Sequence, residues 1–147
     1  MVADRSRPGL APLLVLLAAL LGAPGPAAAQ EVGGVELTEI TVAEAHRAME
    51  AGTLTARMLV EAYFERIAAY DSRGPTFNSL ILLNPRALER ADSLDAALRA
   101  TGALTGPLHG IPVIVKDNYD TGDMPTTAGS ASLEGSVPAD DAFQVRR

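Results

Sequence analysis

The stretch that decides the fold reads Gly-Pro-Leu-His-Gly-Ile-Pro-Val-Ile-Val-Lys-Asp-Asn and occupies residues 106–118. It opens with a tight loop, continues as an apolar run at 111–115, and places Lys116 directly after that run. Lys116 is the only lysine of the chain, since every other basic position is an arginine. Burial lowers the pKa of a lysine and makes it usable as a base, whereas an arginine stays protonated. The alternative is a lysine that ends a strand and points into water.

Two apolar runs predict strands. Residues 80–83 and 111–115 are each continuously apolar, which suits strands that are buried on both faces of a sheet. Residues 84–101 between them predict a helix, because Asn84 can cap it and Pro85 fits its first turn. A strand, a helix and a strand in this order predict parallel pairing with a right-handed crossover. The sequence therefore indicates an α/β fold.

Two further helices are expected before the first of these strands. Thr41 and Glu44 have the spacing of a capping box, which predicts a short helix that ends near Gly52. A longer helix is expected from about Thr55 to residue 71, with an apolar face that repeats every fourth residue. In the third helix, Asp95 and Arg99 are interpreted as an ordinary surface pair.

The N-terminus has the pattern of an export signal. Arg5 and Arg7 precede an apolar run at residues 10–21 that is too short to span a bilayer, and Ala27–Ala29 offers a small-x-small cleavage site. We therefore expect a signal peptide at 1–29, a mature N-terminal tail at 30–38, and a periplasmic or secreted product with no stable membrane anchor. An uncleaved anchor is the alternative, which the short apolar run disfavours.

The composition of the chain argues against several classes of binding partner and cofactor. The formal net charge is −6, which makes the chain a poor partner for phosphate backbones, so no nucleic acid is expected. The absence of cysteine excludes disulfide support, and the core of an exported product must then hold by packing alone. Neither common type of phosphate-binding glycine loop is present, and no cofactor is expected.

Several other polar residues are candidates for chemistry. Ser130 and Ser132 are the serines nearest to Lys116 downstream, and a serine beside a neutral lysine can act as a nucleophile, although turn chemistry explains Ser130 equally well. The remaining candidates are expected to have no chemical role. We expect His46 to be exposed and His109 to anchor its loop by a hydrogen bond. The spacing of Asp117, Asp120 and Asp123 does not match a calcium-binding loop.

Residues 106–118 resemble the amidase signature family at its catalytic lysine, and Thr126–Ser130 resemble the segment that follows it there. The resemblance extends over residues 36–147. It implies the N-terminal portion of the amidase signature fold, a mixed, largely parallel twisted sheet flanked by helices, with residues 39–147 as the N-terminal part of an amidase domain. It also implies hydrolysis of carboxamide bonds by a serine, a second serine in a cis peptide, and a lysine.

On this resemblance Lys116 is the general base and a small-molecule amide is the substrate of the whole enzyme. The family's two catalytic serines lie further along the chain than any serine here, so Ser130 and Ser132 are not assigned as the nucleophile. We therefore expect an N-terminal amidase fragment that is inactive alone. The alternatives are a non-catalytic exported α/β binding domain and a nonfunctional remnant.

Overall fold

The computed structural model describes residues 31–147. In chain order its elements are β1 (Glu31–Val32), β2 (Val35–Glu36), α1 (Val42–Glu50), α2 (Ala56–Tyr70), α3 (Ala87–Thr101), the 3-10 helix η2 (Ala131–Leu133) and α4 (Phe143–Arg146). The signal peptide expected at 1–29 lies outside the described residues. Within them, no helix is long and apolar enough to cross a membrane.

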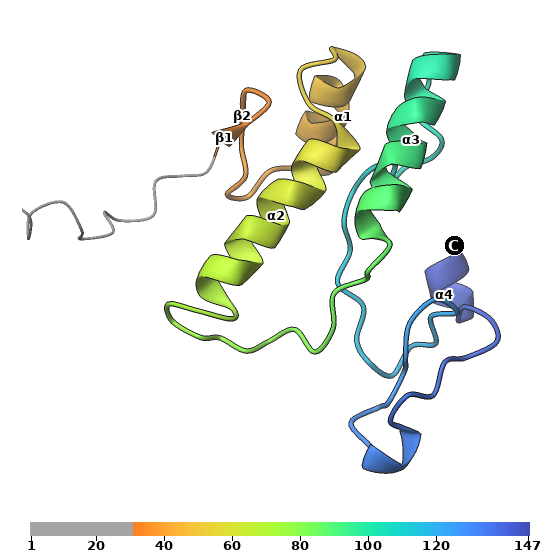
Figure 1. Cartoon of the computed structure of the whole chain (residues 1–147). Coiled ribbons are helices and arrows are strands. Elements are labelled where there is room, and N and C mark those ends of the chain that lie inside the picture. The colour runs from red at the N-terminus through yellow and green to blue at the C-terminus, as the bar shows by residue number, and fades with distance from the viewer. Residues whose placement is uncertain (1–30) are drawn as a thin grey trace, which may run out of the picture.

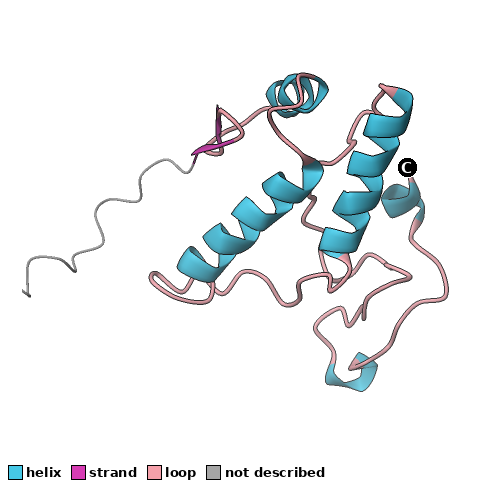
Figure 2. Cartoon of the chain, turned by 45° about the horizontal axis from the view of Figure 1, so that its top comes forward, coloured by secondary structure: helices cyan, strands magenta, loops and turns pink. Residues whose placement is uncertain are grey.

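Three helices form the body of the molecule. The helices α2 and α3 lie side by side and run in opposite directions, with α1 next to the start of α2 (Figure 1). After α3 the chain passes back along the helices and continues as a lobe made mostly of loops, in which η2 and α4 are the only helices (Figure 2).

The helix boundaries follow from local chemistry. At the start of α1, the Thr41 hydroxyl accepts from the Glu44 amide and the Glu44 carboxylate accepts from the Thr41 amide, so the predicted capping box is confirmed. The Thr41 hydroxyl also donates to the Glu44 carboxylate, and this hydrogen bond together with the one from the Thr41 amide lowers the pKa of Glu44. The helix α2 begins after Thr55, whose hydroxyl accepts from the Met58 amide, and α3 ends at Gly102 in the left-handed conformation.

The start of α3 differs from the expectation. Asn84 does not cap the helix, because α3 begins at Ala87 and Arg86 occupies the cap position without a side-chain hydrogen bond. The Asn84 carboxamide oxygen instead accepts from the Arg86 amide, 2.8 Å away, and forms a turn just before the helix. Its NH₂ group donates to the Asp123 carboxylate at 2.8 Å, which ties the foot of α3 to the loop lobe.

The core lies where the three helices meet. Its buried residues come from β2–α1, from α2 and from one face of α3: Leu37, Ala45, Ala48, Met49, Leu54, Ala56, Leu59, Val60, Ala62 and Ala91. On the apolar face predicted for α2, Leu59 and its neighbour Val60 are buried, whereas Tyr63 and Phe64, one turn further on, are half-buried against the core. Alanines at the contact between α2 and α3 let the two helices approach closely. The larger buried side chains of the core are therefore few.

Asp95 contradicts its assignment as a surface residue. Its side chain is only 6% exposed, and its carboxylate accepts from the Ala56 amide at 2.7 Å and the Arg57 amide at 3.1 Å. These are free N–H groups of the first turn of α2, where the helix dipole also favours a negative charge. Asp95 therefore fastens α3 to the N-terminus of α2, and it does not form an ion pair with Arg99.

The segment assigned to the N-terminal tail contains a short hairpin. β1 and β2 pair antiparallel, with Val32 opposite Val35, around a turn of Gly33 and Gly34. A Cβ atom on Gly33 would lie 2.5 Å from the Thr53 carbonyl oxygen, so only glycine allows the hairpin to sit this close to the body.

The two strands expected at 80–83 and 111–115 are absent, and β1–β2 is the only sheet in the described part of the chain. No main-chain N–H or C=O group of residues 81–83 or 113–115 is hydrogen-bonded to another residue in 31–147. A strand requires a neighbour that completes its hydrogen-bond ladder, and no such neighbour is present here. The apolar side chains are accordingly exposed, Ile81 to 76% and Ile114 to 79%.

The loop after α2 is held by Asp71. Its carboxylate accepts from the amide of Ser79 at 2.6 Å and from the hydroxyl of the same residue at 2.5 Å. These hydrogen bonds hold the pKa of Asp71 below its ordinary value of 3.8. The loop is thereby fixed at its two ends, at Asp71 and at Asn84, while its apolar middle is exposed.

The role of Asp95 leads to a stability prediction. We expect Asp95→Ala to lower the free energy of unfolding by about 2 kcal/mol. The substitution removes the hydrogen-bond acceptor of two amides in the first turn of α2, which are shielded from water by the core. The matched control is Asp92→Ala, which removes an exposed carboxylate of the same helix that pairs with Arg57 at 2.6 Å and is expected to cost less than about 1 kcal/mol. Urea unfolding of the 147-residue chain, followed by circular dichroism, measures both. Equal losses in the two variants would contradict this role.

Candidate functional site

The site is built from the loop that precedes residues 111–115. Gly110 has φ of +70°, and a Cβ atom there would lie 2.9 Å from the Ala56 Cβ and 3.0 Å from the terminal methyl of Met49. Glycine is therefore required both for the backbone conformation and for close packing on α1 and α2. This contact sets where residues 111–115 begin, and so where Lys116 stands.

His109 anchors the same loop, as predicted. Its side chain is 3% exposed, and its Nδ1 atom accepts from the Thr105 amide at 3.2 Å. Its Nε2 atom is buried and has no hydrogen-bond partner in residues 31–147. The carbonyl oxygen of His109 accepts from Nε2 of His46 at 3.0 Å. His46 is therefore half-buried and fastens this loop to α1, which corrects the expectation that it is exposed.

Lys116 lies at the end of this path and is exposed. The burial invoked from the preceding apolar run is not found, because residues 113–115 are themselves exposed and shield nothing. The Lys116 amine makes no hydrogen bond or ion pair with any residue in 31–147. Its carbonyl oxygen accepts from the Tyr119 amide at 3.0 Å, which turns the chain sharply after the lysine.

Asp117 connects this turn to the loop that carries the two serines. Its carboxylate accepts from the Thr127 amide at 2.9 Å, from the Thr127 hydroxyl and from the Gly129 amide at 3.4 Å. These hydrogen bonds, chiefly the one from the Thr127 hydroxyl, hold the pKa of Asp117 below its ordinary value of 3.8. The structure therefore joins the segments 116–119 and 126–130, which also carry the two halves of the family resemblance.

The serines interact with each other. The hydroxyl oxygens of Ser130 and Ser132 are 2.7 Å apart, and both residues are on or near the surface. Neither hydroxyl is hydrogen-bonded to Lys116. Residues 31–147 thus bring a lysine and a serine pair onto neighbouring segments without forming a proton relay between them.

Metal and cavity sites do not coincide with this location. No group of three or more histidine, cysteine, aspartate or glutamate residues within 31–147 is arranged to hold a metal ion.

A cavity of about 760 Å³ lies between α3, the 110–115 segment and α4. Its lining includes Val113 and Val115 but neither Ile114 nor Lys116. Lys116 is therefore not part of the cavity wall.

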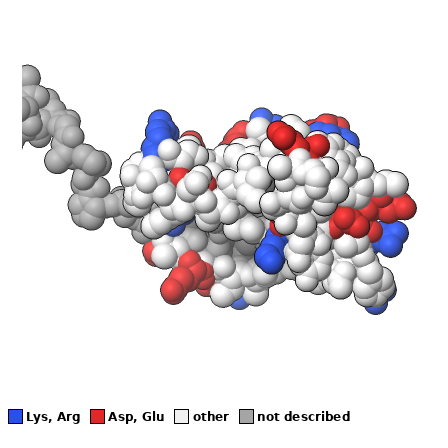
Figure 3. Space-filling model, turned by 90° about the horizontal axis from the view of Figure 1, so that it is seen from below, with Lys and Arg blue, Asp and Glu red and all other residues white. Residues whose placement is uncertain are grey.

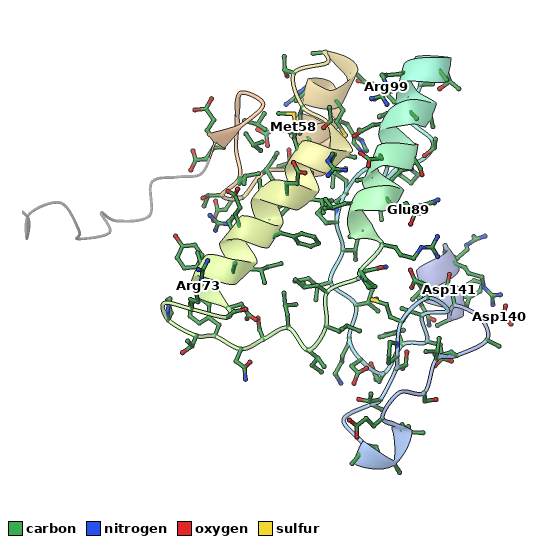
Figure 4. All side chains as sticks on the ribbon, viewed as in Figure 1. Met58, Arg73, Glu89, Arg99, Asp140 and Asp141 are labelled. Carbon is green, nitrogen blue, oxygen red and sulfur yellow. The ribbon has the colours of Figure 1, made fainter. Side chains whose placement is uncertain are left out.

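Two views show how charged residues are distributed on the molecule. Seen from below, the molecule presents a surface in which uncharged residues predominate and charged groups are scattered (Figure 3). Asp140 and Asp141 lie beside α4 at the edge of the loop lobe (Figure 4), where the Asp141 carboxylate accepts from the Gly122 amide at 2.7 Å. The Asp141 carboxylate thus holds two segments of the loop lobe together.

Comparison with solved structures identifies the fold. The peptide amidase from Stenotrophomonas maltophilia matches with a TM-score of 0.68 and 47% identity, over 74% of this chain and 22% of that chain. An amidase family protein from Bacillus anthracis matches with the same TM-score and 37% identity, over 75% of this chain and 22% of that chain.

Comparison with curated proteins agrees. A protein named as an amidase from Schizosaccharomyces pombe is 43% identical over 114 residues, which are 77% of this chain and 19% of that protein. A glutamyl-tRNA(Gln) amidotransferase subunit from Thermobifida fusca is 41% identical over 112 residues, which are 76% of this chain and 22% of that protein. The chain spans about a fifth of the length of these relatives.

The family model described as Amidase matches residues 58–147, a range that includes Lys116 and the Thr126–Ser130 segment. The resemblance inferred from the sequence is therefore confirmed, and the chain belongs to the amidase family.

Proposed function

We propose that this chain supplies the general base, Lys116, of an exported amidase that hydrolyses carboxamide bonds by a serine–serine–lysine mechanism. The observation that carries the proposal is the position of Lys116 inside the matched region, at the end of an apolar segment. Its amine forms no hydrogen bond or ion pair with any other described residue. The segment is fixed at its start by Gly110 and at its end by Asp117.

In the proposed reaction a neutral Lys116 takes a proton from a bridging serine, and that serine takes one from the nucleophilic serine. The nucleophile attacks the amide carbon, the C–N bond breaks, and the leaving amine takes the proton that Lys116 had received, passed back through the bridging serine. Water then hydrolyses the acyl-enzyme. Lys116 is the one participant that we assign to residues of this chain.

The exposure of Lys116 sets a condition on this proposal. A general base must be neutral to accept a proton, and removal of water favours the neutral form of a lysine. We therefore propose that further amidase polypeptide pairs with residues 111–115 in a sheet, covers their apolar side chains and removes water from the lysine. The unpaired main chain of 113–115 supports this step, and the 147-residue chain alone is expected to be inactive.

A chimera tests the role of Lys116. The aligned segment of the Stenotrophomonas maltophilia peptide amidase is replaced by the corresponding segment of this chain, which is 47% identical. We expect hydrolysis of a peptide amide by the chimera, and a fall in kcat of about 1,000-fold in Lys116→Ala, since general-base catalysis contributes on this order. Lys116→Arg is expected to be equally impaired because a guanidinium stays protonated.

Arg99→Ala is the matched control. Arg99 lies at the C-terminal end of α3 (Figure 4), is exposed, and carries the same charge as the lysine. We expect this variant to change kcat by no more than about twofold, as is usual for surface substitutions. An active chimera that keeps its rate in Lys116→Ala would refute the assignment. Turnover by the 147-residue chain that vanishes in Lys116→Ala would refute the need for further polypeptide.

Export is tested by processing of the N-terminus. We expect expression of the chain in a bacterial host to give a periplasmic or secreted product that begins at Gln30, as measured by intact mass. Ala29→Leu should block cleavage because the position needs a small side chain, whereas Ala28→Leu should be processed normally because the middle position of the pattern is free. A cytoplasmic, unprocessed wild-type product would contradict the proposal of export.

A further inference from the structure

Asp117 bonds the loop at 127–129 through both its main chain and its side chain. The Ala128 amide donates to the Asp117 carbonyl oxygen at 2.8 Å, in addition to the hydrogen bonds that Thr127 and Gly129 donate to the carboxylate. The Thr127 hydroxyl itself accepts from the Gly129 amide at 3.2 Å, so the loop is also closed upon itself. Four donors from three consecutive residues thus converge on one aspartate.

The consequence falls on the neighbouring lysine. Asp117 follows Lys116 directly, and the Lys116 carbonyl is bonded to the Tyr119 amide. The main chain at Lys116 is therefore held on its C-terminal side by two sets of hydrogen bonds, while residues 113–115 on its N-terminal side have none in the described chain. Without Asp117, the lysine would stand at the end of an unpaired segment with only the turn to Tyr119 to fix it.

The other aspartates of this region lack such a role. The Asp120 carboxylate makes no hydrogen bond or ion pair with another residue in 31–147, and the Asp123 carboxylate accepts from Asn84 at the foot of α3. Both carboxylate oxygens of Asp117 are already occupied by donors, and no metal-binding group of side chains within 31–147 includes them. The arrangement suits a clamp between two loops and does not suit a ligand for an ion.

We propose that Asp117 is a positioning residue, which fixes the main chain at Lys116 against the 127–129 loop and so orients the general base. The inference rests on the proposed function of Lys116. Asp117 acts through Lys116 and through Thr127, and it does not touch the substrate. Loss of orientation by about 1 Å costs a catalytic group on the order of 100-fold in rate, so the clamp is expected to affect kcat more than KM.

The chain offers a direct probe, because its only lysine gives a single signal when lysine alone is labelled with ¹³C and ¹⁵N. In the 147-residue protein we expect the main-chain ¹⁵N relaxation of Lys116 to report an ordered residue. Thr127→Val keeps the Asp117 charge and the Thr127 amide but removes the hydroxyl donor, and Asp117→Ala removes the carboxylate. Both variants should make the Lys116 amide more mobile, and Asp120→Ala, the matched control, should leave it unchanged.

Titration gives a second readout of the clamp. The Thr127 and Gly129 amide signals should shift together as acid protonates Asp117, with a midpoint below 3.8 in the wild type. Because the folded pKa is lowered, the clamp's contribution to stability is complete above 3.8 and is lost as the pH falls through the lowered value. In Thr127→Val the midpoint should move up towards 3.8, since the main cause of the shift is removed.

Kinetics of the chimera complete the test. We expect Thr127→Val and Asp117→Ala to lower kcat by about 10- to 100-fold with KM changed by no more than about twofold, and Asp120→Ala to behave as the parent. An unchanged Lys116 amide in both variants, or equal effects in Asp120→Ala, would overturn the clamp while leaving the role of Lys116 intact. Full activity of the Lys116→Ala chimera would instead overturn the proposed function, and with it the catalytic part of this inference. If Asp117→Ala fails to fold, Thr127→Val decides.

Discussion

The described structure depends on the hydrogen bond between the Asp95 carboxylate and the Ala56 amide. Ala56 is fully buried at the first turn of α2, its N–H group is held by α3, and its Cβ is the surface on which Gly110 rests. One position therefore joins two helices and the loop that leads to Lys116. A negative charge at a helix N-terminus is stabilised by the dipole as well as by the amides, which explains how Asp95 can be buried without a basic partner.

One part of the molecule has its main-chain hydrogen bonds made and its apolar side chains buried, and another part has neither. The helices meet their own hydrogen-bonding needs and share a core, whereas residues 81–83 and 113–115 expose apolar side chains on a main chain with no partner in the described residues. Exposed unpaired segments of this kind are prone to pair with other chains. The chain spans about a fifth of the length of its relatives, and the function proposed for it has further amidase polypeptide cover these two segments.

Local signals in the sequence predicted the parts of the fold that depend on local chemistry. The capping box of Thr41, the start of α2 at Thr55 and the stop at Gly102 are all as expected, because each is decided within one helical turn. Asp95 was misjudged because its spacing from Arg99 fits a surface pair, and only the neighbouring helix reveals its burial. The prediction of strands at 80–83 and 111–115 was wrong for a related reason. An apolar run becomes a strand only where a neighbouring strand forms main-chain hydrogen bonds with it.

The same limit applies to the site. The motif around Lys116 was sufficient to identify the family, but the three nearby aspartates are indistinguishable in sequence, each a single carboxylate in a loop rich in glycine and threonine. The fold places them differently: Asp117 holds the serine-bearing loop, Asp123 holds the foot of α3, and the Asp120 carboxylate makes no hydrogen bond or ion pair in the described chain. What distinguishes them is which donors the folded chain brings within reach. In the clamp proposed for Asp117, the main chain next to Lys116 is held by a loop ten residues further along, and nothing in the motif around Lys116 indicates that loop.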